Sequence, residues 1–189
     1  MIRIYMDIKF KLIIGRLLVL MIIVLVCHPL EAFGKSSIEK NGDLLMVAIP
    51  AAGYGVALFL EDRDGRVQFH RSFLLNLGVT YSLKTVIDKQ RPDGSGDDSF
   101  PSGHTSVSFH GASFIQTRYG WKYGIPAFTA ASYVAWSRVN ANRHDELDVL
   151  VGAAIGVISS RLFTRPRSDV TVALFALNGH YGMAIRNTW

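Results

Sequence analysis

The sequence has little of what metal-binding and nucleic-acid-binding proteins need. It contains a single cysteine among 189 residues. Outside residues 144–148, its histidines form no close group with cysteine or carboxylates, which is the grouping that metal sites require. It also lacks a basic run interleaved with aromatic residues, so nothing indicates a nucleic-acid partner. Internal repeats and low-complexity tracts are absent as well. We therefore look for a function that needs neither metal nor nucleic acid.

Charged residues are also scarce. They make up 19% of the chain against 49% hydrophobic residues, and the mean hydropathy of +0.23 is apolar for a soluble domain. The net charge is nevertheless +5, from 20 basic and 15 acidic residues. Cationic site residues and basic loops beside membrane segments explain this balance better than nucleic-acid binding does. At this length we expect one domain.

The N-terminal segment lacks a hydrophobic run long enough for an ordinary membrane span. Basic residues precede an apolar stretch from Leu17 to Cys27, whereas a span needs about 20 residues. A short run after positive charges is typical of a secretory signal, and Leu30 to Ala32 offers an imperfect cleavage site. For residues 1–32 we favour a signal sequence over a retained first transmembrane helix. Val26 before Cys27 argues against lipidation.

Five segments of helical length follow. After a polar linker over Lys35–Asp43, we expect helices over Leu44–Leu60, Val67–Ile87, His104–Tyr119, Ile125–Arg138 and Glu146–Phe163. Several contain serine, threonine or histidine, which favours a compact bundle with polar faces turned inward, and His110 is expected to be a packing residue there. Gly152 and Gly156 are spaced for close helix contact. The predicted fold class is all-α, a compact bundle of five to six helices, largely membrane-embedded. A buried helix of a soluble bundle is the alternative for the first segment.

The C-terminal residues do not fit this pattern. Val170 to Trp189 has the pattern of two apolar-leaning strands around Asn178-Gly179, a strong signal for a β-hairpin. A lone hairpin is marginal in water, so we expect it to pack on something. The chain is therefore divided into a leader (1–32), a helical domain (33–168) and a hairpin-like tail (169–189) with no assigned function.

Residues able to do chemistry occur in three short blocks, of which the first is KTVIDKQRP. Lys84 and Arg91 lie seven residues apart in it, so they share a face if the segment stays helical until Pro92 ends it. Arginine offers a planar fork to phosphate oxygens, and lysine a compact charge. The alternative is a solvated basic helix end.

The second block, PSGH, is typical of a turn that enters a helix. Ser102 is a good N-cap, and Gly103 lets the backbone approach an anion closely. The free N–H groups at such a helix start bind anions, and His104 then lies in the first turn, over the anion. Many helices begin this way without taking part in any chemistry, so this block alone is weak evidence for a catalytic site.

The third block is SRVNANRHDELD. Arg138 can clamp a phosphate, and His144 and Asp148 stand four residues apart, which makes them neighbours on a helix. A carboxylate bonded to one imidazole nitrogen fixes the tautomer and leaves the other lone pair facing outward, as a nucleophile requires. The alternative is that His144 and Asp148 form a pair on the protein surface that contributes little. Together the blocks suit gripping a phosphate while one histidine attacks phosphorus and another protonates the departing oxygen.

The blocks resemble the three-part signature of the type 2 phosphatidic acid phosphatase superfamily, Lys-x6-Arg-Pro, Pro-Ser-Gly-His and Ser-Arg-x5-His-x3-Asp. Every signature position is present at the family spacing, within residues 43–163. The resemblance implies that His144 forms a phosphohistidine, that Asp148 orients it, and that His104 is the general acid and later activates water. It implies five phosphate-binding residues: Lys84, Arg91, Ser102, Gly103 and Arg138. It implies no metal and no cofactor.

The resemblance also implies a phosphorylated membrane lipid as substrate, with undecaprenyl pyrophosphate, phosphatidic acid, phosphatidylglycerol phosphate and lipid A as candidates. If the charges of the leader stay in the cytoplasm, all three blocks reach the extracytoplasmic face and the basic loops fall inside. We therefore expect an enzyme of a bacterial inner membrane whose active site faces the periplasm. The bilayer is a partner, nucleic acid is not, and the sequence indicates no oligomeric state.

Three other functions are open. A secreted, soluble, non-specific acid phosphatase would share the motifs and act on soluble phosphate esters. Vanadate-dependent haloperoxidases use the same anion pocket but are much longer chains. A membrane protein that binds or transports phosphorylated lipid with an inactive pocket is the non-enzymatic alternative, and the intact His104, His144 and Asp148 argue against it.

Overall fold

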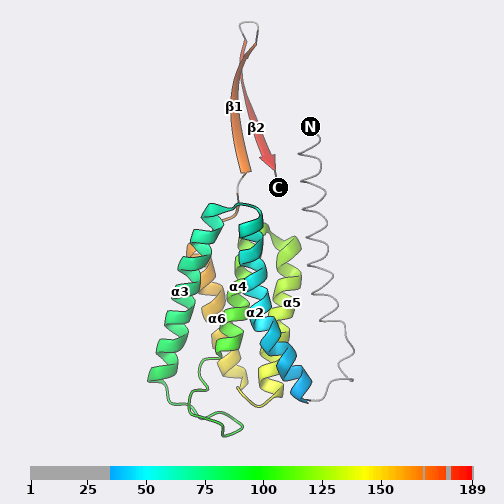
Figure 1. The fold of residues 1–189 in the computed structure, drawn as a ribbon. Helices are drawn as coiled ribbons and strands as arrows, with labels where there is room; N and C mark the ends of the chain where they lie inside the picture. The colour runs from blue at the N-terminus through cyan, green and yellow to red at the C-terminus, as the bar shows by residue number, and fades with distance from the viewer. Residues whose placement is uncertain (1–34, 168, 178–179, 189) are drawn as a thin grey trace.

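The computed structural model describes residues 35–167, 169–177 and 180–188, which form a helical bundle followed by two strands (Figure 1). The described helices are α2 (Lys35–Phe59), α3 (Arg63–Val86), α4 (Gly103–Tyr119), α5 (Trp121–Asn140) and α6 (Glu146–Phe163), and the strands are β1 (Asp169–Leu177) and β2 (His180–Thr188). The predicted all-α bundle is confirmed. The leader predicted over residues 1–32 lies outside the described residues.

Helix α4 forms the centre of the bundle and packs on α2, α3, α5 and α6 (Figure 1). Its contact with α6 is close because α6 presents Gly152 and Gly156 to it. A Cβ atom on either glycine would collide with the α4 side of the interface, at the carbonyl oxygens of Ser102 and Ser106 respectively. The glycine contact expected from the spacing is therefore present, and it places the start of α6 beside the start of α4.

Side-chain caps fix the helix starts near this contact, since they satisfy backbone N–H groups that a helix leaves free. Ser102 caps α4, and its Oγ accepts from the N–H of Thr105. Asp145 caps α6 in a capping box, in which the carboxylate of Asp145 accepts from the N–H of Asp148 and the carboxylate of Asp148 accepts from the N–H of Asp145. Helix α6 accordingly has the bounds that the sequence predicts.

Helix α2 begins earlier than the sequence predicts. The segment Lys35–Asp43, expected to be a linker, forms its first turns. Gly42 lies so close to α5 that a Cβ would meet the side chain of Ser137. The carbonyl of Glu39 accepts a hydrogen bond from Arg138 Nη2 at 2.7 Å. Contacts with a distant helix thus hold in helical form a stretch whose composition alone indicates a linker.

The interior of the bundle has an apolar part and a polar part. The apolar part, between α2, α4 and α5, consists of Leu45, Ile49, Ala112, Ile115, Ala127, Ala130, Ala131 and Val134. The polar part, between α3, α4 and α6, contains the buried side chains of Ser72, Asn76, Thr80, Ser106, His110 and Ser159. His110 Nε2 lies 2.8 Å from Ser72 Oγ, so His110 has the packing role expected of it.

Large hydrophobic side chains face outward on several helices. On α6, Leu147, Leu150, Ile158 and Leu162 are each more than half exposed, and on α2 the same holds for Leu44 and Val47. By length and composition, one of the described helices could cross a membrane, over Ser37–Phe59. An apolar exterior around a partly polar interior is the arrangement expected of helices that associate in lipid.

Strands β1 and β2 pair antiparallel, from Asp169 opposite Thr188 to Leu177 opposite His180. The predicted turn at residues 178–179 lies outside the described residues. In Figure 1 the hairpin extends from the end of the bundle opposite to residues 87–102. The two described strands pair with each other, and the expectation that the hairpin packs on something stays a prediction.

Candidate active site

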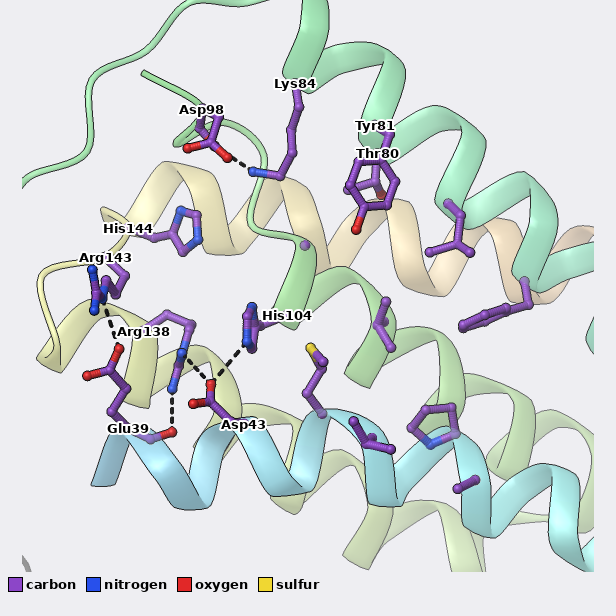
Figure 2. Close-up of a pocket in the computed structure, with 18 of the residues that line it drawn as sticks. Glu39, Asp43, Thr80, Tyr81, Lys84, Asp98, His104, Arg138, Arg143 and His144 are labelled. Atoms are coloured by element: carbon purple, nitrogen blue, oxygen red, sulfur yellow. Dashed lines mark hydrogen bonds and ion pairs between the residues drawn. The ribbon is translucent and has the colours of Figure 1, made fainter. Parts of the chain in front are cut away.

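A cavity of about 960 Å³ opens at the end of the bundle where residues 87–102 connect α3 to α4 (Figure 2). Six of the eight predicted site residues line it: Lys84, Arg91, Gly103, His104, Arg138 and His144. The other two, Ser102 and Asp148, are fully buried behind its wall. The structure therefore brings residues of all three sequence blocks to one cavity.

Lys84 and Arg91 reach the cavity by a route that helical spacing does not predict. Helix α3 ends before Ile87, which has an extended conformation (φ −109°, ψ 101°), so the expected shared helical face is wrong and Pro92 does not end the helix. The loop folds back instead. Lys84 Nζ donates to the carbonyl of Asp98 at 2.6 Å, and Arg91 binds the Asp98 carboxylate at 2.9 and 3.2 Å. The hydrogen bond from Arg91 lowers the pKa of Asp98, which stays charged.

His104 lies in the first turn of α4, as predicted, at the edge of the cavity. Its Nε2 is 3.0 Å from Asp43 Oδ1. An imidazole must carry a proton before it can act as an acid, and Asp43 is the group placed to stabilise that proton.

Arg138 is held in the wall of the cavity with only 3% of its surface exposed. Its Nη1 binds the Asp43 carboxylate at 2.8 Å, and its Nη2 donates to the carbonyl of Glu39. Figure 2 shows Asp43 between Arg138 and His104. The first turns of α2 therefore fix the direction of this guanidinium.

His144 lines the cavity with 4% of its surface exposed. It precedes α6, so the capping box, and not a helical turn as expected, brings Asp148 beside the ring. His144 Nδ1 lies 3.4 Å from both Asp148 Oδ2 and Ser99 Oγ. Nε2 is therefore the nitrogen directed away from that pair. Burial and then the positive charge of Lys84 lower the pKa of His144 to about 4, so its lone pair is free at neutral pH.

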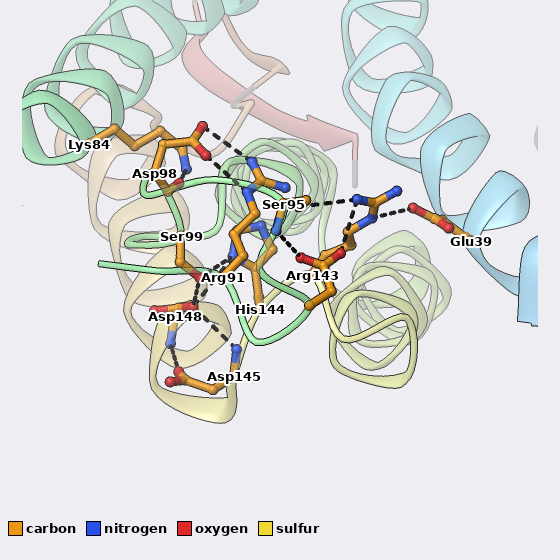
Figure 3. Close-up of polar contacts among 11 residues, drawn as sticks. Glu39, Lys84, Arg91, Ser95, Asp98, Ser99, Arg143, His144, Asp145 and Asp148 are labelled. Carbon is orange, nitrogen blue, oxygen red and sulfur yellow. Dashed lines mark hydrogen bonds and ion pairs between the residues drawn. The ribbon is translucent and has the colours of Figure 1, made fainter. Parts of the chain in front are cut away.

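Asp148 is surrounded by hydrogen-bond donors (Figure 3). Its Oδ1 accepts from Lys89 Nζ at 2.7 Å, and its Oδ2 accepts from Ser99 Oγ at 2.5 Å and from the N–H of Asp145 at 3.2 Å. Lys89 Nζ also lies 2.5 Å from the carboxylate of Asp145. A buried carboxylate needs such partners, because an unpaired buried charge is very costly.

Sequence reasoning missed several residues of the site, among them Asp43, Lys89, Asp98 and Ser99. Each contacts a signature side chain. Lys89 lies inside the first block and Ser99 two residues before the second, so closeness to the blocks was the available signal for both. Asp43 gave no such signal, because its partners His104 and Arg138 are distant in the sequence.

The arrangement can bind an anion and act on it. Among the described residues, the cations Lys84, Arg91, Arg138 and Arg143 line the cavity, and the start of α4 adds free N–H groups. His104 and His144 border the same space, and each is paired with a carboxylate. Asp43 lies beside Nε2 of His104, which suits proton donation, and His144 is neutral with a free lone pair on Nε2, which suits attack at phosphorus. No group of three His, Cys, Asp or Glu side chains in the described part of the chain could hold a metal.

Comparisons with known proteins find similar sequences. A model of the PAP2 superfamily matches residues 67–171. A lipid A 4'-phosphatase of Helicobacter pylori is 31% identical over 142 residues, which cover 69% of this chain and 71% of that protein. A lipid A 1-phosphatase of Porphyromonas gingivalis is 38% identical over 88 residues, which cover 45% of this chain but 20% of that protein.

The fold also resembles a solved structure. The crystal structure of Aquifex aeolicus LpxE superimposes with a TM-score of 0.52, covering 75% of this chain and 91% of that chain. Its sequence identity of 23% supports similarity of fold.

Proposed function

The chain belongs to the PAP2 superfamily and is a phosphoric ester hydrolase, and we propose that it removes phosphate from membrane lipids through a phosphohistidine on His144. The observation that supports this most strongly is the composition of one cavity. Cations and two imidazoles line one end of it, and apolar side chains of α2 and α3 line the rest. Such a cavity suits a molecule with a phosphate head and an apolar body.

In the first half of the reaction, His144 Nε2 attacks phosphorus while the bond from phosphorus to the leaving oxygen breaks. Asp148 stabilises the positive charge that develops on the ring. His104 gives its proton to the leaving oxygen, which departs as an alcohol or a phosphate. Lys84, Arg91, Arg138 and the start of α4 stabilise the negative charge on the phosphoryl oxygens, which is where electrostatic catalysis acts.

In the second half, a water molecule attacks the phosphohistidine and His104 accepts its proton. The N–P bond then breaks, inorganic phosphate leaves, and His144 returns to its neutral form. The chemistry needs no redox change, and the proton given up in the first half is recovered in the second.

The substrate that we propose is a phosphate monoester or pyrophosphate on a lipid head group. Phosphatidic acid, phosphatidylglycerol phosphate, undecaprenyl pyrophosphate and lipid A are the candidates, and the names of the relatives from H. pylori and P. gingivalis favour lipid A. The chain spans 71% of the first relative but a fifth of the second. We place the protein in a bacterial inner membrane, with the cavity facing the periplasm.

The test is phosphate release by the detergent-purified full chain from those lipids and from a soluble phosphate ester, beside His144→Ala and a control variant, Lys122→Ala, at an exposed position outside the cavity. We expect lipid phosphate to be released by the wild type and by Lys122→Ala, and turnover to be abolished in His144→Ala. Quenching with alkaline detergent during turnover should trap acid-labile, base-stable phosphate on the wild type and on Lys122→Ala, and none on His144→Ala. Release from the soluble ester only would indicate a soluble acid phosphatase, and an active His144→Ala variant would exclude the mechanism.

A further inference from the structure

The cavity continues from its cationic end into a groove between α2 and α3 (Figure 2). Met46, Val47 and Pro50 line it on α2, and Phe73 and Leu77 line it on α3. The groove exists because α2 packs mainly on α4 and α5, whereas α3 packs mainly on α6 and α4, so the two helices touch each other little. We call this space the α2–α3 groove.

A cluster of rings closes the far end of the groove. The ring of Tyr54 on α2 lies 5.3 Å from the ring of Phe69 and 5.0 Å from that of His70, both on α3. Phe69 is itself buried, and its ring lies 5.0 Å from that of Phe114 on α4. Tyr54 therefore rests on side chains anchored in the core, and this contact is where α2 and α3 come together.

The length of the groove can be compared with the thickness of one leaflet of a bilayer. Tyr54 follows Asp43, at the cationic end, by eleven residues, which corresponds to about 16 Å of helix at the usual rise. One leaflet of a bilayer contributes half of a hydrocarbon core about 30 Å thick. The apolar length of the groove is thus close to the thickness of one leaflet.

We propose that the α2–α3 groove holds one acyl chain of the substrate and that Tyr54 limits the chain length it accepts. This rests on the proposed lipid phosphatase activity. Because the groove is continuous with the phosphate-binding end, its occupant must have a phosphate at one end and a slender apolar chain at the other. The proposal favours acylated phospholipids and lipid A over polyprenyl pyrophosphates, whose much longer chains exceed the groove.

The experiment measures kcat/KM of the detergent-solubilised full chain for lysophosphatidic acids of increasing acyl length, with glycerol 3-phosphate as the substrate without a tail. Three variants are compared. Tyr54→Ala opens the end of the groove. Ala51→Phe fills it, since Ala51 lines the groove and is exposed. Ala154→Phe, at an exposed position on α6 outside the groove, is the matched control.

For the wild type and Ala154→Phe, we expect kcat/KM to rise with acyl length and then level off at one common length. Tyr54→Ala should move this plateau to longer chains by about one helical turn, about 5 Å. Ala51→Phe should move it to shorter chains and lower kcat/KM for the long acyl chains far more than for glycerol 3-phosphate.

Different outcomes would contradict the lipid phosphatase activity and the role of the groove. A wild type indifferent to acyl length would contradict the proposed lipid specificity itself. A wild type with a clear plateau that neither Tyr54→Ala nor Ala51→Phe moves would leave the phosphatase standing and overturn the role of the groove. If Tyr54→Ala does not fold, the Ala51→Phe arm decides the question alone.

Discussion

At the scale of single residues, the site depends on a carboxylate that never meets solvent. Asp148 is fully buried, yet it keeps its charge because Lys89, Ser99 and the N–H of Asp145 all donate to it. Its geometry then fixes which nitrogen of His144 carries a proton. Two of the three donors come from the loop that follows α3, so the order of that loop bears directly on the nucleophile.

Lys89→Met should lower kcat with little change in KM, because the variant leaves Asp148 Oδ1 without its donor while the phosphate-binding side chains stay in place. We expect a loss of about 10- to 100-fold, the usual cost of removing a partner that orients an active group. The free energy of unfolding should fall by about 1–3 kcal/mol. Lys89→Arg should recover part of kcat, and Lys122→Met, exposed at the other end of the bundle, should leave both quantities unchanged. An unaltered kcat in Lys89→Met would contradict this role.

The pKa of His144, lowered to about 4, gives a pH dependence. Above that pH the imidazole of the folded protein is neutral and able to attack, so the titration of His144 should have its midpoint near pH 4, well below the ordinary value of about 6.5. Between these values the unfolded chain binds the extra proton, so this residue makes the folded state less stable as the pH falls from 6.5 towards 4. Imidazole NMR of the free enzyme, assigned with His144→Ala, measures the midpoint. A midpoint near 6.5 would contradict the lowered pKa of His144.

At the scale of helices, the contact between α4 and α6 sets the position of His144, the proposed nucleophile. The two glycines of α6 let its backbone approach α4, and the start of each helix supplies a histidine and its supporting residues. A change in this contact far from the cavity should therefore reach the chemistry.

Gly156→Ala tests that contact. The added Cβ would meet the backbone of α4 at Ser106 and His110, so the helices must separate. We expect a loss of about 1–3 kcal/mol of stability from overpacking, together with lower activity. The control is Gly78→Ala on α3, where a Cβ meets nothing within 4 Å. There alanine should stabilise by up to about 1 kcal/mol through helix propensity. Chemical denaturation measures the free energy of unfolding of both variants. Equal effects of the two changes would contradict the close contact of α6 with α4.

Local signals predicted some of these elements well and others poorly. The bounds of α6 follow from an acidic cap and a clean apolar run, and the start of α4 from Ser102, so both could be predicted. The start of α2 could not, because Gly42 and Glu39 are helical through contacts with α5. The end of α3 was predicted within one residue, but the shared helical face of Lys84 and Arg91 was wrong, because the chain leaves the helix at Ile87 and the loop pairs Lys89 with Asp98. The signature residues lie together as the sequence predicts. The positions of the residues that support them depend on tertiary contacts, which local sequence signals do not reveal.

At the scale of the whole molecule, the proposed orientation in the membrane rests on the apolar exterior and on the cavity at one end of the bundle. The cavity, with residues 87–102, lies at one end of α5, and Trp121 begins that helix at the other. If the protein spans the inner membrane as proposed, these two ends lie on opposite sides of it.

Cysteine labelling tests this orientation. In a Cys27→Ser background, Asp97→Cys places a thiol in the loop beside the cavity, and Lys122→Cys places one at the start of α5; both positions are exposed. A membrane-impermeant maleimide should label Asp97→Cys in intact spheroplasts and Lys122→Cys only after lysis. The protein should also stay in the membrane through a high-salt wash and leave it in detergent. Labelling of both thiols before lysis would contradict the proposed orientation.

The carboxylates of Asp43 and Asp98 have a consequence for the end of each catalytic cycle. They already neutralise Arg138 and Arg91 when no substrate is bound. Orthophosphate must compete with these built-in counterions, so it binds less tightly than it would to bare guanidinium groups. The enzyme should accordingly resist inhibition by its own product and stay available in a phosphate-rich medium.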